Sequence, residues 1–111
     1  MAKNDILQGT LVLLVLRTLA AHKQLHGYAI TQYIQTVSSE LLRVEEGSLY
    51  PVLQRMETKG WVTSEWKQSP TGRQARYYRI TTAGRRQLGA EEASFHKSVA
   101  ATTRVLRGAD T

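Results

Sequence analysis

The sequence predicts a mainly α-helical fold that carries one small β-hairpin. Residues 6–21 contain no proline and six consecutive apolar side chains, and the length of the stretch favours a helix over a strand. The apolar residues of 49–56 recur at i, i+3, i+4 and i+7, which is the spacing of one buried helical stripe. Two stretches, 61–66 and 76–81, flank the turn residues 69–73 and alternate in polarity as hairpin strands do.

Length and composition indicate one soluble domain that spans residues 1–111. The hydrophobic content of 41% and the charged content of 22% are ordinary for such a protein. The strongest apolar run, residues 11–16, is far shorter than the roughly 20 residues that cross a bilayer, and it makes a poor signal peptide. We therefore expect a cytoplasmic protein without a membrane partner.

The first predicted helix, residues 6–21, is apolar nearly all round its middle. A surface helix needs only one apolar stripe, so this helix must be covered on more than one side. In a domain of this size we expect a second subunit to supply part of that cover. The first helix is therefore predicted to be a dimer contact.

Two further helices are predicted before the hairpin. The second covers residues 28–37, where Ile30, Tyr33, Ile34 and Val37 fall at helical spacing. The third covers residues 47–59, with its apolar stripe turned inward and a glycine directly after its end. The side chains that this third helix turns outward are Tyr50, Gln54, Arg55 and Thr58.

The hairpin is followed by a long final helix. In the hairpin, residues 61–81, alternation is expected to turn Val62, Tyr78 and Ile80 inward. The final helix, residues 82–107, begins at two threonines that can cap it, and it carries a partial heptad seam. We expect this C-terminal dimerisation helix to dock against the first helix of a partner chain. The seam residues are Leu88, Phe95, Val99 and Leu106.

Positive charge is concentrated in and just after the hairpin. Between Lys67 and Arg86 there are six basic side chains and no acidic one, whereas the rest of the chain carries nine of each sign. A basic hairpin behind a helix suits the phosphates of nucleic acids. Three helices followed by a hairpin is also the order of a winged helix-turn-helix, here residues 27–81, in which the wing rests on the DNA backbone.

Several short motifs resemble the PadR family of transcriptional regulators. They are Gly-Ser-Leu-Tyr-Pro at 47–51, Lys-Gly-Trp-Val at 59–62, Arg-Tyr-Tyr-Arg-Ile-Thr-Thr-Ala-Gly at 76–84 and His-Gly-Tyr at 26–28. The resemblance covers roughly residues 6–107. It implies a cytoplasmic homodimer that binds operator DNA, usually as a repressor, and that small aromatic or drug-like ligands release in some members. The short C-terminal segment resembles the subgroup with a single dimerisation helix.

Geometry and this resemblance together select the candidate DNA contacts. On the third helix, Arg55 has the geometry to bind guanine and Gln54 to bind adenine, and contact with phosphate instead of a base remains open for both. The wing residues are expected to bind phosphates, with Arg73 at the tip in position to enter the minor groove. The full candidate set is Ser48, Tyr50, Gln54, Arg55, Lys67, Arg73, Gln74 and Arg76.

Phe95 is the candidate contact for an effector. The resemblance places it where drug-sensing relatives carry an aromatic residue, often tryptophan, at the centre of the dimer. A phenyl ring can stack on a flat ligand, although it has less area than an indole and no N–H donor. The alternative is that Phe95 only packs the dimer seam.

The remaining residues indicate neither catalysis nor a bound cofactor. The chain has no cysteine, and its three histidines are too dispersed for a metal site. No glycine-rich phosphate loop, nucleophile elbow or facing carboxylate pair is present, so we predict no catalytic residue, no metal, no cofactor and no enzymatic activity. Tyr28, Tyr33 and Tyr78 are interpreted as core residues.

Two other functions compete with DNA binding. The winged helix could serve as a protein interaction module whose basic wing meets an acidic partner, without preference for an operator. A ligand-binding or enzymatic domain would need a concave polar site, and the sequence offers no candidate for one.

Overall fold

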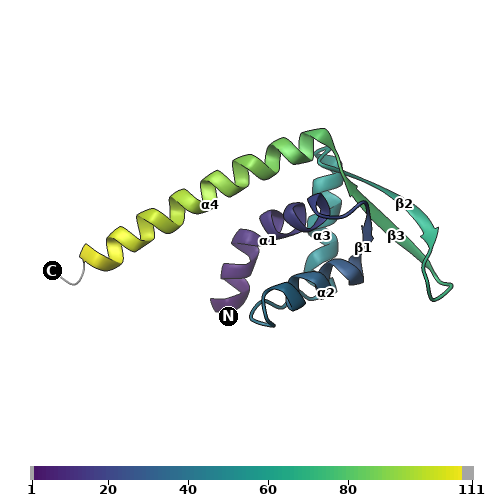
Figure 1. The fold of residues 1–111 in the computed structure, drawn as a ribbon, viewed down its shortest axis with the longest axis horizontal. Helices are drawn as coiled ribbons and strands as arrows, with labels where there is room; N and C mark the ends of the chain where they lie inside the picture. The colour runs from purple at the N-terminus through teal and green to yellow at the C-terminus, as the bar shows by residue number, and fades with distance from the viewer. Residues whose placement is uncertain (1, 109–111) are drawn as a thin grey trace.

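The computed structural model describes residues 2–108, with the backbone alone described for residues 2–9 (Figure 1). It has the mainly helical fold with a small sheet that the sequence predicts. Residues 1 and 109–111 of the expected domain lie outside the described part. In chain order the elements are α1 (Ala2–Ala20), β1 (Leu25–His26), α2 (Gly27–Val37), α3 (Glu46–Thr58), β2 (Val62–Gln68), β3 (Gln74–Ile80) and α4 (Thr82–Gly108).

One hydrophobic core joins all four helices to the inner face of the sheet. On α3, the predicted stripe is buried, with exposures between 0% for Leu49 and 7% for Val52. α1 contributes buried leucine and valine side chains, and α4 contributes Leu88 from its first two turns. Because every element places its apolar side in this core, the opposite side of α3 faces outward.

The first helix is longer than predicted and is only partly covered by its own chain. Its backbone is helical from Ala2, not from residue 6, since residues 2–5 contain neither glycine nor proline to interrupt it. On its described side chains, Leu11 and Val15 are buried, whereas Val12 and Leu13 remain half-buried at the edge of the core. The chain therefore leaves some apolar surface of α1 without full cover.

The second helix starts at a cap formed by a histidine side chain. The ring of His26 accepts a hydrogen bond at Nδ1 from the backbone N–H of Ala29, at 3.1 Å, which leaves the ring proton of a neutral His26 on Nε2. The buried face of α2 consists of Gly27, Ile30, Thr31 and Ile34.

One prediction about α2 is wrong, and one residue at the predicted helical spacing is exposed. Val37 falls at that spacing, but it is the last helical residue and is 62% exposed. Tyr28 was expected in the core and is 58% exposed, since it lies away from the buried face of the helix.

The sheet has three strands, in the order β1-β3-β2, and all pairings are antiparallel. β2 and β3 form the predicted hairpin, in register from Val62 opposite Ile80 to Gln68 opposite Gln74. The predicted inward set is confirmed, with Val62, Tyr78 and Ile80 all buried. The sequence does not indicate β1, because a strand of two residues shows no readable alternation.

The last helix begins at the base of the hairpin and extends away from it. Thr81 caps it as predicted, because its Oγ1 accepts a hydrogen bond from the N–H of Gly84 at 3.0 Å. Its first half packs on α1 of its own chain, where Glu92 pairs with Arg17 at 2.6 Å. The helix was expected to dock on the first helix of a partner, but this half of it docks on the first helix of the same chain. In Figure 1 the far half of α4 and the tip of the hairpin point to opposite ends of the molecule. Within residues 2–108, no helix has the length and apolar character needed to span a membrane.

We predict opposite effects on stability for two glycines of α4. A methyl group on Gly84 would clash with the Trp61 carbonyl and approach Ile80 Cγ1 to 2.8 Å. Gly84→Ala should therefore lower the free energy of unfolding by about 1–3 kcal/mol. Denaturant unfolding at a fixed protein concentration measures the change.

Gly89→Ala is the matched control, because nothing lies within 4 Å of the added methyl group. Alanine is the better helix former, so this variant should be more stable by about 0.5–1 kcal/mol. Equal stability of the two variants would contradict the close packing of α4 on the base of the hairpin.

Candidate nucleic-acid interface

A groove of about 760 Å³ separates the first half of α3 from the wing, defined as residues 62–80. Glu46 and Tyr50 line it from α3, and Arg73 and Gln74 line it from the wing. The two elements that the sequence selects for DNA contact thus face one shared concave surface. Neither Tyr50 nor Arg73 is buried against its own fold.

Tyr50 is held in this groove by the start of α2. The absence of a side chain at Gly27 makes room for the ring, since a Cβ there would lie 2.7 Å from Tyr50 Cζ. The Tyr50 hydroxyl donates a weak hydrogen bond to Glu46 Oε2 at 3.4 Å. Partial burial raises the pKa of Tyr50 above its ordinary value, and the Glu46 carboxylate raises it further. The hydroxyl therefore stays protonated at neutral pH and remains a donor.

The wing tip, residues 69–73, is a compact turn that presents Arg73. The N–H of Ser69 donates to the Arg73 carbonyl at 2.6 Å, and the Gln68 amide donates to the Gly72 carbonyl at 3.0 Å. Gly72 has a φ of 91°, a conformation that glycine adopts without strain. These bonds give the tip a defined shape while the Arg73 side chain stays exposed.

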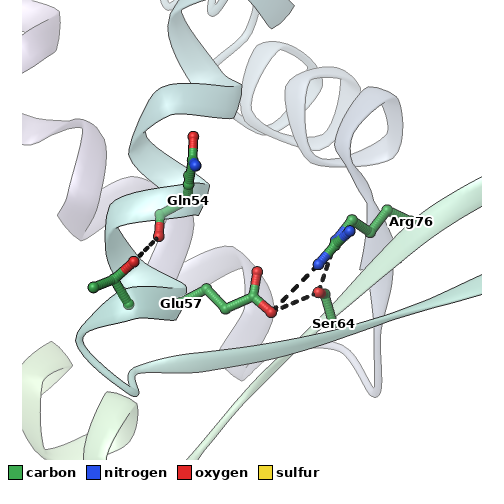
Figure 2. Close-up of polar contacts among 5 residues, drawn as sticks. Gln54, Glu57, Ser64 and Arg76 are labelled. Carbon is green, nitrogen blue, oxygen red and sulfur yellow. Dashed lines mark hydrogen bonds and ion pairs between the residues drawn. The ribbon is translucent and has the colours of Figure 1, made fainter.

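Arg76 lines the same groove but is engaged within the fold. Its Nε donates to Ser64 Oγ at 2.8 Å, and that hydroxyl donates in turn to Glu57 Oε2 at 2.8 Å (Figure 2). Arg76 Nη2 also lies 3.6 Å from Glu57 Oε2, and the guanidinium carbon lies 5.6 Å from the centre of the Trp66 ring. Arg76 therefore differs from Arg73 in having internal partners for its charge.

The other candidate residues lie outside the groove. Gln54 and Arg55 line a separate shallow hollow of about 380 Å³ along the exposed side of α3, and Ser48 is exposed in the first turn of that helix. The Lys67 ammonium lies 5.2 Å from the centre of the Tyr77 ring, within the wing. The predicted set thus covers the groove, the neighbouring side of α3 and the wing.

Most of the residues that line the groove are absent from the predicted set, including several with aromatic rings. Tyr28, Trp66 and His26 all line it. Tyr28 could have been found by noting that it lies away from the apolar positions of its helix, whereas Trp66 gives no signal beyond its place on the hairpin. These residues make the groove more aromatic than the sequence suggests.

The basic segment does not form one patch in space. Arg73 is at the tip and Arg76 is inside the groove, whereas Arg79 lines a different hollow together with Glu65. Arg85 and Arg86 belong to the start of α4. The alternation of strand residues and the turn into α4 explain this spread.

No second kind of site emerges from the described residues. Among them, no three His, Asp or Glu side chains lie close enough to hold a metal ion. Phe95 is 39% exposed on α4 and its ring makes an edge contact with His96, with ring centres 5.6 Å apart. In the single chain it lines neither the groove nor the hollow of α3.

Comparison with known proteins identifies the family. Residues 15–90 match the family model described as the transcriptional regulator PadR-like family. The chain is 34% identical over 88 residues to an uncharacterized protein of Lysinibacillus sphaericus, covering 79% of this chain and 80% of that protein. It is 42% identical over 69 residues to the transcriptional regulator Rv3488 of Mycobacterium tuberculosis, covering 62% of this chain and 61% of that one.

Solved structures agree with this result. A PadR family transcriptional regulator from Eggerthella lenta superposes with a TM-score of 0.76 at 31% identity, covering 92% of this chain and 86% of that one. A PadR-like transcriptional regulator from Bacillus cereus gives a TM-score of 0.74 at 26% identity, covering 92% and 96% respectively. The similarity therefore extends over the winged helix and much of the long last helix.

We predict that Gly27→Ala displaces the ring of Tyr50, because the added methyl group and the Tyr50 hydroxyl cannot occupy the same space. The ring resonances of Tyr50 should shift, and the nuclear Overhauser contacts between this ring and residue 27 should weaken. Gly47→Ala serves as the control, since nothing lies within 4 Å of its added methyl group. An unchanged Tyr50 environment in Gly27→Ala would contradict the described seat.

Proposed function

The chain belongs to the PadR-like family of transcriptional regulators, and we propose that it is a repressor that binds a pseudo-palindromic operator as a homodimer in the cytoplasm. The observation that carries this proposal is the shared groove, which presents Tyr50 of α3 and Arg73 of the wing together. A winged helix uses these same two elements on one DNA duplex. Repression would follow from occupation of promoter DNA.

The residues divide into two roles. The exposed side of α3 would enter the major groove, where Arg55 and Gln54 contact base edges and Ser48 and Tyr50 contact a base or phosphate. The wing would rest on the backbone. Lys67, Arg73 and Gln74 are its proposed phosphate contacts.

The far half of α4 is the proposed dimer seam. Phe95, Val99 and Leu106 are 39%, 47% and 64% exposed, and at about 100° per residue they fall on one side of the helix. Their burial against a second chain would also cover the half-buried side chains of α1. A two-fold dimer would place its two α3 helices about 34 Å apart, which is one turn of DNA.

An aromatic effector would act through the same seam. A flat ligand inserted beside Phe95 would separate or rotate the two α4 helices. This would favour a dimer whose α3 helices no longer match one turn of DNA, and the operator would be released.

We predict a strong salt dependence of binding. With about six to eight phosphate contacts per dimer, the log–log slope of affinity against salt should be about −5 to −7. Fluorescence anisotropy with a duplex from upstream of the chain's own gene and with a scrambled duplex measures the slope and the preference. A flat slope would contradict DNA binding, and equal affinity for both duplexes would favour the protein interaction module.

Single variants separate the two roles within this assay. Arg55→Ala should reduce the preference for the operator by about 1–3 kcal/mol. Arg73→Ala should weaken binding to both duplexes equally and should reduce the salt slope of the affinity by about 1 per subunit. Arg104→Ala is the control with the same change of charge, because Arg104 is exposed on the far half of α4, away from the wing.

We predict that Val99→Glu dissociates the dimer, because a carboxylate would be buried in the proposed seam without a partner. Sedimentation velocity at micromolar concentration should show a dimer for the wild type and a monomer for the variant. Lys97→Glu is the control, since residue 97 lies on nearly the opposite side of the helix. A monomeric wild type would contradict the dimer.

A further inference from the structure

β1 pairs with β3 through Leu25 and His26, and besides this pairing side chains attach the wing to the rest of the fold at two levels. At its base, Thr81 Oγ1 donates to the carbonyls of Gly60 and Trp61, and Val62 and Ile80 enter the core. Halfway along, Ser64 of β2 and Arg76 of β3 bond with Glu57 of α3.

Beyond this second level, the described hydrogen bonds of the wing stay within it. Ser69 bonds with Arg73 and Thr71, and Gln68 bonds with Gly72. The three-residue contact is therefore the outermost polar connection between the wing and α3 among the described residues. The position of the wing tip relative to α3 therefore depends on this three-residue contact more than on the hydrogen bonds nearer the tip.

The chemistry of the contact suits a rigid connection. The Ser64 hydroxyl accepts a hydrogen bond from Arg76 and donates one to Glu57, so it acts as both acceptor and donor in a continuous chain of hydrogen bonds from β3 to α3. The guanidinium is also packed against Trp66, on the strand that pairs with its own. Figure 2 shows the side chains from the two strands converging on the one carboxylate of α3.

The charge of Arg76 is offset at close range. The Glu57 carboxylate, 3.6 Å from Arg76 Nη2, cancels much of the field that this arginine would exert on a phosphate. Arg73 and Lys67 have no carboxylate in the salt bridges of the described residues. Arg76 is therefore less suited to a phosphate contact than they are.

We propose that Glu57, Ser64 and Arg76 are positioning residues that set the angle between the wing and α3. They would hold Arg73 and Tyr50 at the separation that one DNA duplex requires, without contacting DNA themselves. This inference rests on the proposed DNA binding. It gives Arg76 a positioning role in place of the phosphate contact that the sequence suggests.

Removal of the Glu57 charge gives a sharp test, because geometry and simple electrostatics predict opposite signs. Glu57→Gln removes a negative charge from a DNA-binding protein, which by itself should tighten binding to phosphates. Loss of the connection should instead weaken operator binding by about tenfold, the size of one coupled polar network. Glu65→Gln is the matched control, since Glu65 alternates with Ser64 and so lies on the opposite face of β2, and it should bind as tightly as the wild type or tighter.

A double-mutant cycle then identifies the partner. Arg76→Gln and the double variant with Glu57→Gln should each lose about as much operator affinity as Glu57→Gln alone, because one connection is broken in all three. A direct phosphate contact by Arg76 predicts instead that Arg76→Gln weakens binding, that Glu57→Gln tightens it, and that the two effects add. The second pattern would overturn the proposal.

A distance measurement without DNA tests the geometry directly. The chain has no cysteine, so spin labels on Thr58→Cys and Thr71→Cys report only the separation of α3 and the wing tip. Protein carrying both labels would be diluted into unlabelled protein, which keeps labels on different subunits from contributing. Pulsed electron resonance should show a broader distance distribution when Glu57→Gln or the milder Ser64→Ala is added, with Glu65→Gln unchanged.

The two proposals can fail separately. A wild type without operator preference or salt dependence would contradict the proposed function, and the spin-label distances would still test the connection. The positioning role alone would be overturned if the wild type binds its operator and Glu57→Gln has the same operator affinity and the same width of distance distribution. Circular dichroism and thermal unfolding of each variant confirm that it is folded.

Discussion

The packing of the sheet's inner face against the apolar stripe of α3 is the constraint on which the other features depend. Val62 and Ile80 are buried opposite one another, and Leu53 of α3 is fully buried in the same core. This contact fixes which side of α3 faces outward. It also fixes which side of each strand faces the groove, because successive strand residues alternate. Tyr50 and Arg73 share one surface as a result.

Most of the fold follows from periodicity in the sequence. The stripe of 49–56 and the alternation of the two hairpin strands predict α3 and the inward set Val62, Tyr78 and Ile80, since burial selects residues at these periods. Periodicity cannot reveal β1, whose two residues are ordered by pairing with β3. It also cannot show where a helix passes the end of the core, and Val37 is exposed although it falls at the helical spacing.

The candidate site was only partly predictable, because charge along a chain does not specify direction in space. The basic segment is continuous in the sequence, yet its members lie at the tip, inside the groove, on another hollow and at the start of α4. The connection of Arg76 to Glu57 joins residues far apart in the chain, and no local pattern marks it. Tyr28 lines the groove from the first turn of α2, which the His26 side chain caps.

A single residue, Thr81, separates the end of β3 from the start of α4, and its hydroxyl bonds with Trp61 at the base of the wing and with Gly84 of α4. The long helix is therefore fixed to the root of the wing at its start and packed on α1 along its first half. Twenty-seven helical residues form a rod about 40 Å long, so a movement of about 3 Å at its far end turns it by only about 4°. A relative movement of two subunits at the far ends of their α4 helices would therefore cause only a small rotation of the surface formed by α3 and the wing.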